Sequence, residues 1–151
     1  VDPNGRVSVY TGSSPHGQGL ETTYSQIAAQ VLGVTVDDVT VLHGDTNVVA
    51  HGAGTFASRS LAVGGPAIYN AAQKIRSKKL RIAAHCMGIA PEELVFEDGV
   101  FTPPGRAEPR LTMAEVAQAA YSMHLRPGNM EYGLDEASFF QPTDLTFQYE
   151  T

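Results

Sequence analysis

The sequence predicts an α+β domain in which a mixed β-sheet carries helices packed mainly on one face. Strand, helix and strand patterns follow one another between Val7 and His43, which is typical of a βαβ unit with parallel strands. A long alanine-rich helix pattern follows, and a hairpin pattern then precedes a further helix. A chain of 151 residues is long enough for a hydrophobic core, so we expect residues 1–151 to form one domain.

The elements of the βαβ unit follow from their periodicity. In "GRVSVYTG", Val7 and Val9 alternate with Ser8 and Tyr10, which is typical of a strand with one buried face. Apolar residues then recur at helical spacing over residues 21–32. The glycine that follows stands where a left-handed cap residue is expected, and "VDDVTVLHG" restores the strand pattern.

The remaining elements have equally local signals. A helix is expected from about Ser58 to Met87, with either a kink at Pro66 or a start near that residue, because proline disrupts a helix interior. "APEELVFEDGVFTPPG" predicts a hairpin that turns at residues 97–99. "LTMAEVAQAAYSM" opens with a T-x-x-E capping box and predicts a helix. "EASFF" and "LTFQYE" predict the last strands.

Composition and charge exclude several classes of function. The net charge of −6 argues against a nucleic-acid-binding module. No apolar run approaches the roughly 18–20 residues that a membrane span needs. No signal-peptide pattern is visible, and the single cysteine, Cys86, permits neither an internal disulfide nor a cysteine-based metal cage, so we expect a cytoplasmic protein. The start at Val1 and the abrupt end in "LTFQYET" suggest a fragment excised from a larger protein.

One long segment of this acidic chain contains no acidic residue. It lies between Asp45 and Glu92 and includes the basic residues Arg59, Lys74, Arg76, Lys78, Lys79 and Arg81. An anion site is one interpretation of such a segment. For the run over residues 74–81 we favour the other interpretation, a solvated basic helix end that complements the helix dipole.

Two glycine-containing segments each lead directly into a predicted helix. The first delivers Gly17, Gln18 and Gly19, and the second, "HGAGTFASRS", delivers Gly54 with several hydroxyl side chains and an arginine. Free backbone N–H groups at helix starts bind anions, and glycines let a ligand approach the backbone closely. Two such segments indicate a ligand with two anionic or strongly polar ends. The alternative is that these glycines only make turns.

Other candidate sites are weaker. Gly52, Gly54 and Ala57 match G-x-G-x-x-A, but no acidic residue follows at the distance that a dinucleotide site requires, and no P-loop lysine is present. His43, Asp45 and His51 match no standard metal-ligand spacing. We therefore predict no catalytic residue and no metal ligand in this chain.

At the two glycine segments the sequence resembles a known family. "GSSPHGQGLETTYSQIAAQVLG", "HGDTN", "GAGTFASRSLAVGGPAI" and "FFQPTDLTFQYET" occur in this order and resemble the molybdenum hydroxylases, which include xanthine dehydrogenases, aldehyde oxidases and the large subunit of aerobic carbon monoxide dehydrogenase. The resemblance extends over essentially all of the chain. It implies a fold like the molybdenum-cofactor-binding domain, and a proline in "GGPAI" departs from it.

The resemblance implies a function for both segments. They would hold a molybdopterin cofactor, in the cytosine dinucleotide form, whose own sulfurs carry the molybdenum. The implied cofactor-binding residues are Gly17, Gln18, Gly19, Gly54, Thr55, Phe56, Ala57, Ser58, Arg59 and Ser60. The family's catalytic glutamate and substrate loop lie outside this segment, so the isolated chain is expected to be inactive.

The implied partners are the remainder of the large subunit and the iron–sulfur and flavin subunits or domains that receive the electrons. Two alternatives stay open. One is a non-catalytic module that binds a nucleotide or a phosphorylated ligand, and the other is an interaction domain.

Overall fold

The computed structural model describes residues 1–143 except 50, 98, 106–107 and 109. Its elements run in the order β1 (Val7–Thr11), α1 (Leu20–Leu32), η1 (Val36–Asp38), β2 (Val39–His43), α2 (Ser60–Met87), η2 (Pro91–Glu93), β3 (Val95–Glu97), β4 (Val100–Thr102), β5 (Leu111–Thr112) and α3 (Met113–Ala120). The α+β class is therefore confirmed. The described strands form two separate sheets, however, and not one mixed sheet.

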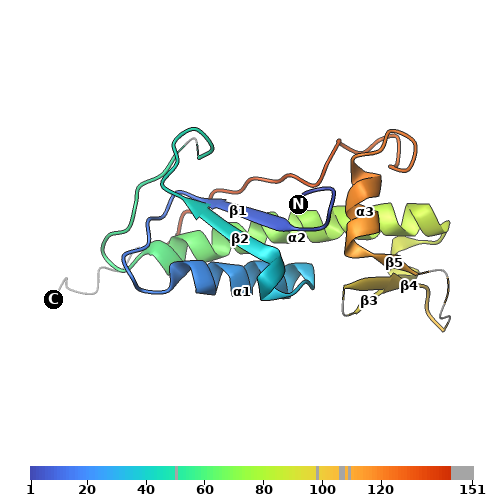
Figure 1. The fold of residues 1–151 in the computed structure, drawn as a ribbon, viewed down its shortest axis with the longest axis horizontal. Helices are drawn as coiled ribbons and strands as arrows, with labels where there is room; N and C mark the ends of the chain where they lie inside the picture. Colours follow the sequence, from blue (N-terminus) through green and yellow to red (C-terminus); the bar gives the residue numbers. More distant parts are fainter. Residues whose placement is uncertain (50, 98, 106–107, 109, 144–151) are drawn as a thin grey trace.

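The first sheet belongs to the predicted βαβ unit. β1 and β2 pair in parallel, and Val7 lies opposite Val39, so the register follows the alternation seen in the sequence. One face of this sheet packs on α1 (Figure 1), and Tyr24 and Ala28 of this helix are buried. Gly33 caps α1 in the left-handed conformation that the sequence predicts, with φ of 63°.

α2 is the longest element, and the two small sheets lie along its length (Figure 1). It runs from Ser60 to Met87 and continues through Pro66, so the expected helix from about Ser58 to Met87 is confirmed, and of the two alternatives at the proline a start near Pro66 is wrong. The N-terminal part of α2 packs on α1, which stabilises the helical turns on both sides of the proline. No helix among the described residues is long and apolar enough to cross a membrane.

The second sheet is antiparallel and has the order β3-β4-β5. Glu97 pairs with Val100, which confirms the predicted hairpin, although Asp98 of its turn lies outside the described residues. Thr112 caps α3 through the predicted capping box, since its hydroxyl accepts from the Glu115 N–H at 3.3 Å.

The predicted C-terminal strands have different outcomes. Residues 136–140 form no strand, because no described strand pairs with them, and they run extended along α2. Lys74 of α2 donates to the Ala137 carbonyl at 3.0 Å. The strand expected in "LTFQYE" lies outside the described residues.

Lys79 shows that the basic run of α2 is not a uniformly solvated helix end. Its side chain is fully buried, and its ammonium lies 3.6 Å from the centroid of the Phe96 ring. The ammonium also donates to the Leu32 carbonyl at the end of α1. Lys79 therefore joins α1, α2 and the hairpin, and desolvation, with a smaller effect of the Arg76 charge, lowers its pKa to about 7.

We expect Lys79 to make a contribution to the free energy of unfolding that rises as the pH increases from about 7 towards 10. Lys79 keeps its proton in the unfolded chain over most of this range but loses it in the folded chain as the pH rises above about 7, so the unfolded state binds more protons. Thermal melts across this range should show the rise, and Lys79→Met should flatten it. Lys74→Met removes an exposed lysine from the same helix and should leave the slope as it is. Equal slopes for wild type and Lys79→Met would contradict the assignment.

Candidate functional site

Two loops leave the same edge of the parallel sheet. The first loop (residues 12–19) connects the end of β1 to α1, and the second loop (residues 44–59) connects the end of β2 to α2. Thr11 and His43, the last residues of the two strands, lie opposite each other in the register. In sheets with parallel strands, ligands bind outside the carboxyl ends of the strands. The topology thus brings both predicted segments to the usual position of a ligand site.

The first loop ends in a turn that requires glycine. Gly17 and Gly19 have φ of 93° and 76°, and no atom lies within 4 Å of a Cβ built at either position. Gly19 is the N-cap of α1 and, as a glycine, has no side chain that could cap the helix. Gln18 is exposed, and its Oε1 accepts from the His16 N–H. The loop therefore presents backbone N–H groups beside open space, and this holds whether the glycines admit a ligand or only form the turn.

The second loop leads into α2 through an unusual backbone. Ala57 and Ser58 both have positive φ, 50° and 54°, a conformation that residues other than glycine adopt uncommonly. Gly54 has φ of 74° with open space at its Cβ position. Arg59 is the N-cap of α2 and lies 5.8 Å from the centroid of the Phe56 ring. The first turn of α2 contains no acidic residue, so this helix start is electropositive.

The two loops cross at a pair of glycines. A Cβ built on Gly12 would lie 2.6 Å from the Cα of Gly52, and one on Gly52 would lie 2.9 Å from the Cα of Gly12. The Gly54 N–H donates to the Gly12 carbonyl at 3.0 Å. The Ser14 N–H donates to Thr55 Oγ1 at 3.3 Å. The two loops that carry the predicted segments are thus in direct contact through Gly12 and Ser14 of the first loop.

Two of the ten predicted residues bind each other. The hydroxyl oxygens of Thr55 and Ser60 lie 2.8 Å apart and are partly buried. In this arrangement they stabilise the entry to α2. Of the other members of the second segment, Phe56, Ala57 and Ser58 are exposed and Gly54 and Arg59 are partly buried, whereas all three residues of the first segment are exposed.

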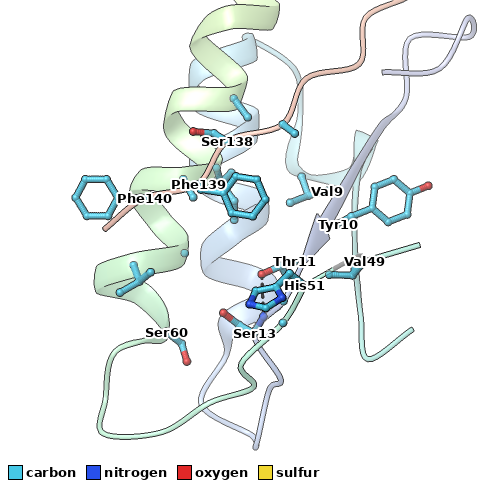
Figure 2. Close-up of a pocket in the computed structure, with 18 of the residues that line it drawn as sticks. Val9, Tyr10, Thr11, Ser13, Val49, His51, Ser60, Ser138, Phe139 and Phe140 are labelled. Carbon is cyan, nitrogen blue, oxygen red and sulfur yellow. Dashed lines mark hydrogen bonds between the residues drawn. The ribbon is translucent and has the colours of Figure 1, made fainter. Parts of the chain in front are cut away.

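A pocket of about 710 Å³ adjoins the crossing. It is lined by β1, the second loop, the N-terminal half of α2 and the extended residues 136–142. Figure 2 shows Thr11, Ser13, His51 and Ser60 at one end, and apolar side chains such as Phe139 towards the other. The pocket is therefore polar near the loops and mostly apolar farther along α2.

The other side chains considered from the sequence have a different arrangement. His43 pairs with Glu21 of α1 at 2.9 Å, which connects the end of β2 to the first turn of the helix. Among the residues that the structure describes, no group of three His, Cys, Asp or Glu side chains is placed to hold a metal ion. Cys86 is an exposed residue, and partial desolvation of its thiol raises its pKa.

Sequence reasoning missed the contacts that organise the site. Gly12 and Gly52 pack backbone against backbone, and neither lies in a predicted helix or strand. The extended residues 136–142, which line the pocket, were expected to form a strand in part. The glycines of the two loops were the signal available for a close backbone approach. The sequence does not indicate which glycine of the first loop contacts which glycine of the second.

Comparisons with known proteins identify relatives that cover nearly the whole of this chain. A family model described as "Molybdopterin cofactor-binding domain" matches residues 1–151. The carbon monoxide dehydrogenase large chain of Afipia carboxidovorans is 36% identical over 149 residues, which cover 99% of this chain and 18% of the relative. The xanthine dehydrogenase molybdenum-binding subunit of Escherichia coli O157:H7 is 31% identical over 132 residues, which cover 86% of this chain and 18% of that subunit.

Solved structures give the same result. The structure of the reconstituted CO dehydrogenase from Oligotropha carboxidovorans matches with a TM-score of 0.86 and 37% identity, over 97% of this chain and 18% of that one. Quinoline 2-oxidoreductase from Pseudomonas putida 86 matches with a TM-score of 0.83 and 36% identity, over 95% of this chain and 18% of that one. The resemblance predicted from the two glycine segments is confirmed, and the chain belongs to the molybdopterin cofactor-binding domain family of the molybdenum hydroxylases.

Proposed function

We propose that the two crossed loops hold a molybdopterin dinucleotide within the large subunit of a molybdenum hydroxylase. The proposed contacts are Gly17, Gln18, Gly19, Gly54, Thr55, Phe56, Ala57, Ser58, Arg59 and Ser60. The observation that carries the proposal is the crossing at Gly12 and Gly52, which brings two helix starts to one edge of the parallel sheet. When bound, the cofactor would supply a molybdenum centre that oxidises a small molecule with water as the oxygen source.

The residues of the site fit such a cofactor. The glycines with positive φ have open space where a side chain would project, so an extended ligand can contact the backbone there. Neither α1 nor α2 has a side-chain cap at its N-terminus, which leaves backbone N–H groups for phosphate oxygens. Arg59 stands at the start of α2 and offers a planar fork for the same oxygens.

The finer features of the proposal rest on the relatives. A cytosine dinucleotide form and iron–sulfur and flavin partners are proposed from the similarity to carbon monoxide dehydrogenase large chains. The remainder of the large subunit is the proposed partner of the outer face of the β1-β2 sheet, where Tyr10 and Leu42 are 53% and 39% exposed. The proposed catalytic glutamate and substrate loop belong to that remainder.

Analysis of the purified full-length protein tests the proposal. Molybdenum should be present, and mild acid treatment should release cytidine monophosphate from the cofactor. Release of a different nucleotide would contradict the proposed cytosine form and identify another dinucleotide form of the cofactor. A protein that contains a nucleotide or a phosphorylated ligand but no pterin would instead support the non-catalytic binding module.

Gln18→Ala in the full-length protein should weaken cofactor binding by about 1–3 kcal/mol. The exposed amide is proposed to make neutral hydrogen bonds to the cofactor, and a lost partner at a partly desolvated site costs this much. Molybdenum per folded molecule, measured during dialysis against a chelator, reports the effect. Gln26→Ala removes an exposed glutamine from α1 outside the loop and is the matched control. If both variants retain molybdenum equally, Gln18 does not contact the cofactor.

A further inference from the structure

We infer that Tyr24 is a positioning residue that holds both cofactor loops and the start of α2 in place through its hydroxyl. The inference rests on the proposed function. Tyr24 lies on α1, where its side chain is fully buried. Its hydroxyl donates to the Ser60 carbonyl at 2.7 Å and lies 3.1 Å from the hydroxyl oxygen of Ser13. One side chain thus contacts the first loop and the first residue of α2.

The hydrogen bonds continue from Tyr24 into the second loop. Ser60, whose carbonyl accepts from Tyr24, binds Thr55 through its hydroxyl at 2.8 Å. Thr55 in turn accepts from the Ser14 N–H in the first loop at 3.3 Å. These bonds form a closed circuit, which we call the Tyr24 network: Tyr24, Ser13, Ser14, Thr55 and Ser60. A shift of either loop relative to the other would break at least one of its bonds.

The packing around the hydroxyl is as specific as its hydrogen bonds. A Cβ built on Gly64 of α2 would lie 2.3 Å from the Tyr24 hydroxyl and 3.0 Å from Cζ of its ring. α2 therefore approaches α1 this closely only because residue 64 has no side chain. The phenol ring determines the spacing of the helices, and the hydroxyl determines the position of the loop ends.

Tyr24 does not act by touching the cofactor. Its side chain is 0% exposed, and it does not line the pocket beside the loops. Its effect on binding must therefore pass through Ser13 and Ser60. A ligand that spans two loops loses affinity when the loops are free to separate, because binding must then also pay for their ordering.

Tyr24→Phe in the full-length protein tests this role, because phenylalanine keeps the ring and removes only the hydroxyl. We expect the cofactor to dissociate roughly 5–10-fold faster, as the loss of one buried hydrogen bond predicts. Tyr121→Phe is the matched control. The Tyr121 hydroxyl donates to the Val1 carbonyl at 2.8 Å, outside both loops. Tyr121→Phe should lower the melting temperature without changing the rate at which the cofactor dissociates.

A second substitution separates the hydroxyl from general stability. Gly64→Ala should release the cofactor faster in the wild-type background, because the new Cβ would collide with the Tyr24 hydroxyl. In the Tyr24→Phe background the closest atom is absent, so the same substitution should cost less. Equal effects of Gly64→Ala in both backgrounds would contradict the proposed contact.

Hydrogen exchange distinguishes failure of this inference from failure of the proposed function. Loss of the Tyr24 hydroxyl should accelerate exchange at residues 12–14 and 53–60, in protein with or without cofactor. Faster exchange in a protein that binds no pterin would overturn the proposed function and retain the loop-ordering role. Wild-type exchange and wild-type cofactor dissociation in Tyr24→Phe would overturn the inference itself.

Discussion

Gly12→Ala should separate the two loops and remove most of the cofactor from the full-length protein. The new Cβ would lie 2.6 Å from both the Cα of Gly52 and the carbonyl oxygen of His51. These are backbone atoms, so no rotamer change relieves the collision, and the loops must move. Overpacking of this kind costs typically about 1–3 kcal/mol of stability. The hydrogen bond from Gly54 to the Gly12 carbonyl would also be strained.

A thermal melt and the molybdenum content per folded molecule measure the two consequences of Gly12→Ala. Gly128→Ala is the matched control, because no atom lies within 4 Å of its Cβ position and its φ is not in the left-handed region. It should leave both quantities unchanged. If Gly12→Ala destabilises the protein but the folded fraction keeps its molybdenum, then the crossing supports the fold without supporting the cofactor.

The second large effect is expected at Arg59. If its guanidinium binds a phosphate of the cofactor, Arg59→Ala removes hydrogen bonds to a charged group, which contribute about 1.5–3 kcal/mol. Cofactor affinity should then fall roughly 10- to 150-fold, with a matching loss of molybdenum at limiting cofactor concentration. Arg59→Lys should restore little, because the lysine ammonium lacks the planar fork.

The alternative role of Arg59 is structural, since it is the N-cap of α2 and lies beside Phe56. In that case Arg59→Ala should lower the melting temperature while molybdenum per folded molecule stays at the wild-type value. Arg81→Ala removes an exposed arginine from the same helix and controls for the change in charge. Full molybdenum occupancy in both Arg59→Ala and Gln18→Ala would remove the site assignment and favour loops that serve only as turns.

Features whose cause is local could be predicted from the sequence. The left-handed cap at Gly33 and the capping box at Thr112 depend on residues within one turn of each helix. The parallel pairing of β1 and β2 followed from the strand-helix-strand order. The hairpin followed from its turn signal, although Glu97, which was expected in the turn, is the last residue of β3 and pairs with Val100. The caps and the hairpin depend on contacts within a short stretch of chain, and the parallel pairing depends on the order of three consecutive elements.

Features that depend on distant contacts could not be predicted. The alanine-rich pattern indicated a helix from about Ser58, but the sequence did not determine whether it continues through Pro66, which depends on the packing of α2 on α1. Lys79 looked like a solvated lysine because the aromatic rings that cover it come from the hairpin. The contact between Gly12 and Gly52 depends on the paths of two loops, and loop paths leave no periodic pattern in the sequence from which they could be predicted.

The residues of the candidate site were named from motifs, and their contacts with a cofactor stay a prediction. The structure adds a distinction among them that the motifs do not contain. Thr55 and Ser60 bind each other, whereas Gln18 and Phe56 are exposed. We therefore expect substitutions at the first pair to act mainly through loop order, and those at the second pair mainly through the ligand.

The glycine crossing also has a consequence for protein engineering. Because Gly12 and Gly52 meet through main-chain atoms, the side chains that the loop geometry requires are those of the Tyr24 network, and the exposed side chains of the loops are not among them. Exposed positions in either loop can be randomised to alter ligand preference while the geometry of the crossing is kept. The smallest segment worth transplanting into another scaffold is residues 7–64, since it contains both glycines, Tyr24 and the glycine that faces its hydroxyl. A graft of one loop alone would lose the partner that holds it in place.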